Sequence, residues 1–173
     1  ELRRRVWLYS MVPLLGFLIG FLLYQQGEDV FWRVLAYLAV FHFVRQQWGW
    51  VAMYRGRLRE RDTFSLWLDR LTIYLATLYP LIYWHANLAE AKFRWFRTGD
   101  FVRDKWIFDL PAIFTTLERI AFPLYCVVML AYWIRSTYLW RAGRGNPGKD
   151  IVVLTTAVCW YIGIVAFNSD YAF

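Results

Sequence analysis

The sequence predicts an all-α fold, a polytopic transmembrane bundle of about five spanning helices, for two reasons. First, 60% of the 173 residues are hydrophobic and 21% are aromatic, more large apolar side chains than a soluble domain of this length buries in its core. Second, only 19% of the residues are charged, and they form short clusters between apolar stretches that are each close to the roughly 20 residues a spanning helix needs.

The predicted spans cover residues 6–24, 30–54, 64–85, 111–140 and 151–173. The fourth is longer than one span requires, and the mixed charged and aromatic segment 101–118 before it is typical of a helix at a membrane surface. A turn rich in glycine separates the last two spans at 143–148. We expect one integral-membrane domain, and because the sequence begins without Met and stops at Phe173, an internal fragment of a longer chain.

The net charge of +7 indicates orientation rather than a partner. The connections before span one, between spans two and three and between spans four and five hold ten Lys and Arg residues, against five in the other two. By the positive-inside rule, Glu1 is cytoplasmic and Phe173 lies at the outer face. The compact connections favour a bacterial inner (plasma) membrane. Nucleic acid is excluded as a partner, because the basic residues form neither one face nor a tail.

Polar residues inside spans are costly and are therefore the first functional candidates. In the second span His42, Arg45 and Gln46 share one helical face with Gly49, near mid-membrane. His42 could ligate a chlorophyll-type pigment, a haem or a metal ion; the alternative is a hydrogen-bonded structural histidine of the bundle. The predicted cofactor-binding residues are His42, Gln46, Trp48 and Trp50.

The remaining candidates form an intramembrane polar network of Arg45, Asp69, Glu118 and Asp170. We expect Arg45 to pair with Asp69 of the third span, because a lone charge in hydrocarbon is costly. Glu118 and Asp170 are both expected on the outer side and could form an acid/base pair. The alternative for these two is ion pairing with a neighbouring arginine or a plain position at the membrane interface.

His42 and His85 are also candidate ligands of a shared metal ion, although the two histidines are expected at different depths in the membrane. Cys126 and Cys159 have no CxxC spacing and are predicted to be inert core residues. The sequence contains no Walker A loop, Rossmann fingerprint, zincin motif or nucleophile elbow.

Three functions are compatible with these features. The first is a structural or interaction subunit of a larger membrane assembly, in contact with lipids and other subunits, that could hold a pigment or haem through His42. The second is a membrane-embedded enzyme, dependent on metal or acid/base chemistry, that acts on a lipid or other hydrophobic substrate at His42, Arg45 and Asp69. The third is a transporter or channel, which an odd number of spans without an inverted repeat disfavours.

Overall fold

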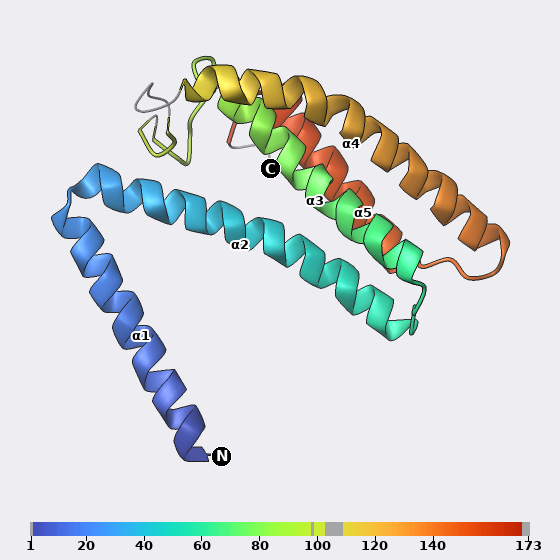
Figure 1. Ribbon diagram of the computed structural model, residues 1–173, viewed down its shortest axis with the longest axis horizontal. Coiled ribbons are helices and arrows are strands. Elements are labelled where there is room, and N and C mark those ends of the chain that lie inside the picture. The colour runs from blue at the N-terminus through green and yellow to red at the C-terminus, as the bar shows by residue number, and fades with distance from the viewer. Residues whose placement is uncertain (1, 98, 103–108, 171–173) are drawn as a thin grey trace.

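A computed structural model describes residues 2–97, 99–102 and 109–170, with side chains from residue 5 onward, and this part of the chain is all-α as predicted (Figure 1). The elements are five α-helices followed by a π-helix: α1 (Leu2–Gln25), α2 (Glu28–Arg57), α3 (Thr63–Ala86), α4 (Leu110–Arg141), α5 (Pro147–Trp160) and η1 (Tyr161–Ala166). Each of the first four predicted spans coincides with one helix. The fifth prediction ran too far, because the helical backbone ends at Ala166 and residues 167–170 are not helical; residues 171–173 of that predicted span lie outside the described residues.

Three segments of the described helices are long and apolar enough to cross a membrane: Arg5–Gln25, Leu110–Arg141 and Pro147–Ala166. This is fewer than the five spans predicted. Helices α2 and α3 fall short because polar residues interrupt them, Arg45-Gln46-Gln47 in α2 and Asp69-Arg70 in α3.

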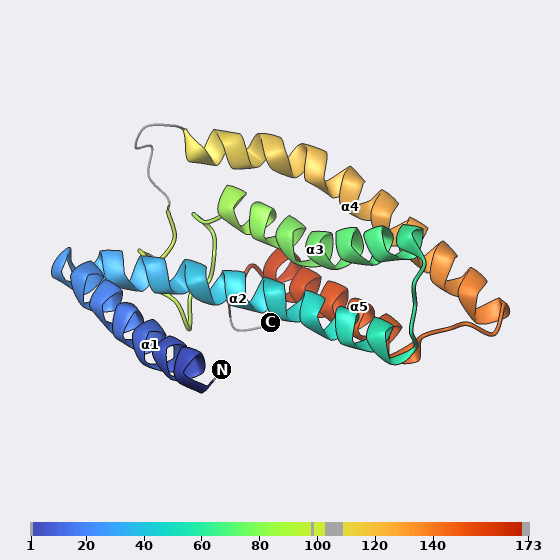
Figure 2. The ribbon, with the colours of Figure 1, turned by 60° about the horizontal axis from the view of Figure 1, so that its bottom comes forward.

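Helix α3 lies at the centre of the bundle and packs against α2, α4, α5 and η1 (Figure 2). Its sequence begins with a capping residue, since the Asp62 carboxylate accepts a hydrogen bond from the Ser65 amide at 3.0 Å. Buried residues of α3 belong to two apolar clusters. One surrounds Trp84 and Phe101, and the other contains Ile73 and Tyr132.

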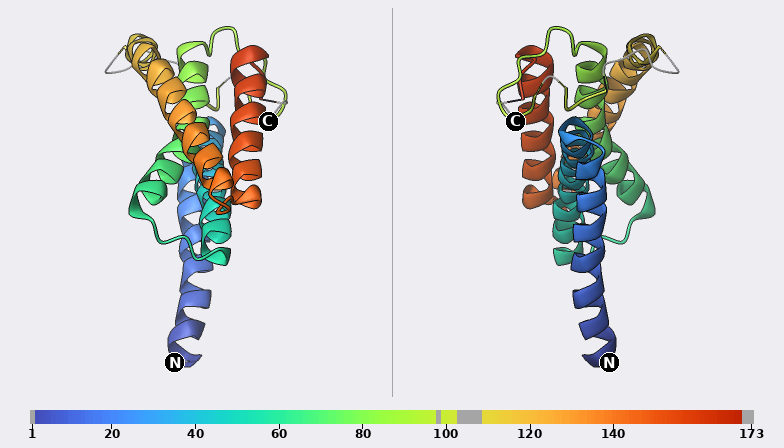
Figure 3. Two further views of the ribbon diagram at one scale, coloured as in Figure 1. Left: turned by 90° about the vertical axis from the view of Figure 1, so that its right-hand side faces the viewer. Right: turned by 90° about the vertical axis from the view of Figure 1, so that its left-hand side faces the viewer.

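Helix α1 stands apart from this bundle. It contacts α2 and diverges from the other helices beyond the turn at Gly27, whose φ of 119° favours glycine (Figures 1 and 3). None of its described side chains is buried by the rest of the chain. Its position is therefore not fixed by a core of its own.

The helices alternate in direction, so the connections gather at two ends (Figure 1). We call residues 54–70 and 132–150 the charged end, where α2 meets α3 and α4 meets α5. The aromatic end comprises the described residues 33–37, 84–97, 99–102 and 160–170. This alternation is the one expected for spans two to five.

Candidate functional site

Four charged side chains pack together at the charged end, and we call them the buried ion cluster: Arg55, Glu60, Asp69 and Lys149. The Asp69 carboxylate accepts from Arg55 and from Lys149 Nζ, the latter at 3.0 Å. Glu60 Oε2 accepts from the same two cations at 3.0 and 2.8 Å. Asp69, Lys149 and Arg55 are 2, 3 and 5% exposed, so these charges are removed from water and compensate one another.

Local sequence brings these groups together. Asn146 caps α5 by accepting from the Lys149 amide, while its side-chain amide donates to Glu60 Oε1 at 2.6 Å and to the Tyr54 carbonyl at 3.1 Å. A Cβ at Gly148 would overlap the Tyr54 ring. Glycine at this position therefore allows the first turn of α5 to approach the last turns of α2, which places Lys149 beside Asp69.

A further carboxylate, Asp150, lies next to the cluster, and its hydrogen-bond donors in the described part of the chain are neutral. Asp150 accepts from the Tyr132 hydroxyl at 2.6 Å, the Ser136 hydroxyl at 2.8 Å and Trp140 Nε1 at 2.7 Å. Its position in the first turn of α5 also places it at the positive end of the helix dipole. Three side chains of α4 thus fix the start of α5.

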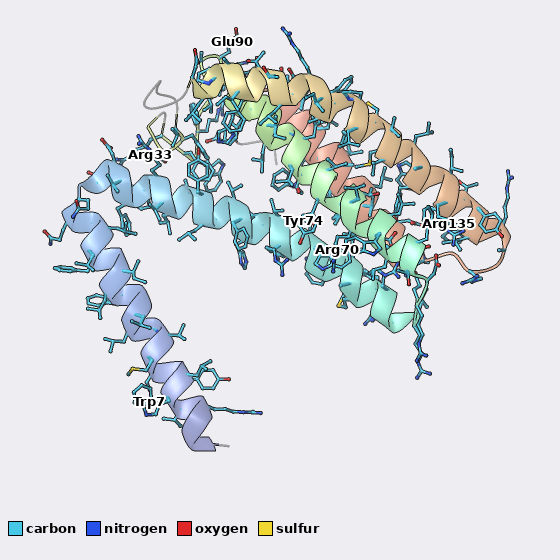
Figure 4. All side chains as sticks on the ribbon, viewed as in Figure 1. Trp7, Arg33, Arg70, Tyr74, Glu90 and Arg135 are labelled. Carbon is cyan, nitrogen blue, oxygen red and sulfur yellow. The ribbon has the colours of Figure 1, made fainter. Side chains whose placement is uncertain are left out.

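Asp62 closes the cluster on the side of α4. Arg135 donates to Asp62 Oδ2 at 2.9 Å and to the Ser65 hydroxyl at 3.2 Å, and Figure 4 shows Arg135 at this end of α4. The Ser65 hydroxyl and amide, together with Arg135, lower the pKa of the Asp62 carboxyl to about 2. Asp62 is therefore an anion at neutral pH and is already compensated.

An open cavity of about 620 Å³ adjoins these groups between the α2–α3 and α4–α5 connections, and we call it the arginine cavity. Arg59, Arg61 and Arg144 line it, together with Glu60 and Asp62. Arg59 adopts a φ of 53°, a left-handed conformation that is unusual for a residue with a side chain.

The predicted cofactor-binding face lies on the outside of α2. His42, Gln46 and Trp50 are exposed, whereas Trp48 is half-buried, stacked on Tyr74 with ring centroids 6.4 Å apart. His42 contacts the Phe43 ring and has no hydrogen-bond partner among the described residues. The alternative of a histidine hydrogen-bonded within the bundle is therefore not supported.

The predicted pair of Arg45 and Asp69 is wrong. Arg45 Nη1 donates to the Tyr74 hydroxyl at 2.9 Å, and Figure 4 shows Tyr74 between α2 and α3. Arg45 lies ten residues before Arg55, about 15 Å along the helix, and so it is too far from the start of α3 to reach Asp69. The three residues of the predicted enzymatic site, His42, Arg45 and Asp69, are not brought together.

His85 uses both ring nitrogens at the aromatic end. Nδ1 donates to the Leu81 carbonyl at 2.7 Å, and Nε2 accepts from the Tyr37 hydroxyl at 2.9 Å. The Tyr37 oxygen in turn accepts from the Val102 amide at 3.2 Å. These bonds give His85 a structural role, and the described residues contain no group of three or more His, Cys, Asp or Glu side chains that could hold a metal ion.

Asp170 also has a structural role, as a buried acceptor for three backbone amides of Arg94, Trp95 and Phe96 at 2.7 to 2.8 Å. Glu118 is half-exposed on α4, and no contact with Asp170 is found among the described residues. The structure therefore does not assemble the predicted acid/base pair.

The prediction that Cys126 and Cys159 are core residues is wrong, because both are exposed on the outer faces of α4 and α5. When apolar residues occur on every side of a helix, the sequence does not tell which side packs inward.

The sequence analysis also missed four residues of the charged end: Arg55, Glu60, Lys149 and Asp150. The signal that could have found them is their closeness in sequence to the two short connections. Arg55 and Asp69, for example, are each seven residues from Asp62, on either side of the first connection.

Comparisons of the chain with protein-family models, with curated proteins and with solved structures found no match.

Proposed function

We propose that the chain is an integral membrane subunit of a larger membrane assembly, with a structural and interaction role. In this proposal all five helices lie across a bacterial inner membrane, with Glu1 and the charged end on the cytoplasmic side. The single observation that carries the proposal is the exposure of His42, a polar side chain halfway along α2 without a hydrogen-bond partner in the described chain.

An imidazole at mid-membrane depth is costly in contact with lipid alone. His42 therefore requires a hydrogen-bonding or ligating group from outside this chain. A neighbouring subunit supplies such a group without any change in the α2–α5 bundle, since the exposed face of α2 is already accessible.

Helix α1 supports the same proposal. Most of its apolar side chains are exposed, for example Phe17 at 69% and Leu22 at 62%. In water this surface would be unfavourable, whereas lipid chains and a neighbouring helix both cover it. At Gly16 an added Cβ would meet nothing within 4 Å, so the backbone there is open to close approach by another helix.

The polar groups inside the bundle support a structural role over transport. The buried ion cluster is internally compensated, Asp150 has three donors, and Gln47 accepts from Thr156 at 3.0 Å. Side chains that line a conducting path would instead face an open lumen. These groups hold helices together.

The mass of the protein in polymer-bounded discs cut from native membranes tests this proposal. We expect the wild-type particle to contain at least one protein chain besides this one, and Gly16→Leu to reduce the content to this chain alone. Val127→Leu, on an exposed position of α4, is the matched control and should leave the mass unchanged. A wild-type particle with this single chain would refute the proposal.

A second candidate function is cofactor binding at the same position, favoured by the exposure of Gln46 and Trp50 beside His42. A chlorophyll-type pigment or haem would then lie against the outer face of α2 and be shared with a neighbour. Visible absorbance that is lost in His42→Leu and kept in His85→Leu would support it. A colourless wild-type protein, without bound metal by elemental analysis, would exclude it.

A further inference from the structure

We propose that the arginine cavity binds the phosphate-bearing headgroup of an anionic phospholipid. The cavity lies at the end of α4 and along the connection that leads into α5, and the segments Leu110–Arg141 and Pro147–Ala166 on either side of this connection are long and apolar enough to cross a membrane. This inference rests on the proposed membrane location of the chain. It does not depend on the proposed neighbouring subunit.

The charges around the cavity leave a local positive excess. Its two acidic residues are already compensated, Glu60 by Arg55 and Lys149, and Asp62 by Arg135. Asp69 shares the cations of the buried ion cluster, which is neutral as a whole. The cavity arginines are therefore not needed to compensate any of these acids.

In the described part of the chain, the guanidinium groups of Arg59, Arg61 and Arg144 have no hydrogen-bond or ion-pair partner. Guanidinium presents two parallel N–H donors that match two oxygens of a phosphate group. Three such groups around one cavity provide more donors than one solvated chloride or carboxylate requires. A phosphate ester is the anion that this donor set fits best.

The size and walls of the cavity favour a lipid over free phosphate. A volume of about 620 Å³ is within the range of pockets that hold a whole small organic ligand, and inorganic phosphate would fill only a small part of it. Leu58 and Leu139 line the cavity beside the arginines and can contact the glycerol and first acyl carbons. Basic pockets at the cytoplasmic ends of spanning helices are known to bind such headgroups.

Left-handed backbone conformations shape the two connections that line the cavity. Arg59 at φ 53° and Gly143 at φ 69° turn the two connections, and both residues line the cavity. A Cβ at Gly145 would overlap the Trp140 ring, so this connection folds closely over the end of α4. The arginines are thus carried on two turns that lie next to the buried ion cluster.

Native mass spectrometry of the full chain, released from bilayers of phosphatidylcholine and phosphatidylglycerol, tests this site. We expect the wild type to retain one phosphatidylglycerol. The double variant Arg61→Gln/Arg144→Gln should lower this retention at least about tenfold, because one hydrogen bond to a charged group contributes about that factor. The matched control Arg57→Gln/Arg141→Gln removes the same charge at the same end, outside the cavity, and should retain the lipid.

Equal loss in both double variants would overturn the proposal, since it would show that general charge alone attracts the lipid. Displacement of the lipid by millimolar inorganic phosphate would overturn the lipid as the occupant. Recovery of the wild-type chain in the soluble fraction of cells would instead refute the membrane location on which this inference rests. A wild-type disc with a single chain that still retains phosphatidylglycerol would refute only the neighbouring subunit.

Discussion

Replacement of Asp69 by Asn tests whether the buried ion cluster holds the bundle together. The substitution keeps the size of the side chain but removes the charge that Arg55 and Lys149 share, and only Glu60 is left to compensate two cations that are at most 5% exposed. Removal of one member of a buried ion pair typically costs about 3–5 kcal/mol. We expect Asp69→Asn to lower the free energy of unfolding by that amount.

The measurement is unfolding by SDS in mixed micelles, followed by tryptophan fluorescence. Glu28→Gln is the control, because it also removes one carboxylate from an ion pair, the one with Arg97. Both side chains of that pair are more than half exposed. A surface pair of this kind contributes about 0–1 kcal/mol, so the control should stay close to the wild type.

The double variant Asp69→Asn/Lys149→Gln restores charge balance, since Arg55 and Glu60 then compensate each other. We expect it to be more stable than the sum of the two single variants by roughly 0.5–3 kcal/mol. If Asp69→Asn were no more destabilising than Glu28→Gln, or if the single effects were additive, the cluster would not stabilise the bundle in the way described.

Three further predictions concern single positions. Gly148→Ala should destabilise the protein by about 1–3 kcal/mol, because the added methyl group would overlap the Tyr54 ring. Gly49→Ala should instead stabilise it by roughly 0.5–1 kcal/mol, because an added Cβ there meets nothing within 4 Å. Thermal unfolding of both variants in the same detergent measures the difference. Asp62 has a pKa lowered to about 2 in the folded chain, so its contribution to stability is complete above the ordinary carboxyl pKa and is lost as the pH falls through about 2. The stability difference between wild type and Asp62→Asn should therefore be constant above about pH 4 and shrink below it, and a constant difference down to pH 2 would contradict this. Asp170→Ala should speed hydrogen exchange at the three amides that its carboxylate accepts from, and unchanged protection would show that the carboxylate does not anchor them.

The helices could be predicted from the sequence because apolar stretches and short polar connections mark them clearly. The bounds of α3 differ from its predicted span by a single residue at each end. The partners within the site could not be predicted as well, since they depend on the register between helices. Arg45 and Arg55 are both arginines of α2, and only the packing of α3 decides which of them meets Asp69.

The fifth span was predicted too long for a different reason, because the polar residues that follow Phe167 were included in it. Its apolar sequence continues to Phe167, one residue past the end of the π-helix η1 at Ala166. The polar residues Asn168, Ser169 and Asp170 follow, and Asn168 has a φ of 47°. The Lys92 amide donates to the Asn168 carbonyl at 2.8 Å, and the Asp170 carboxylate accepts from the backbone amides of residues 94–96. These contacts with a segment some 75 residues away hold the chain in the course it takes after the helix ends.

The order of synthesis gives the buried ion cluster a role in how the chain is built. Arg55, Glu60 and Asp69 leave the ribosome first, on the α2–α3 hairpin, and these three members of the buried ion cluster sum to one negative charge. Lys149 follows 80 residues after Asp69, at the start of α5. Helix α5 therefore brings the cation that completes the charge balance of the buried ion cluster, so its docking is favoured once the α2–α3 hairpin is in place.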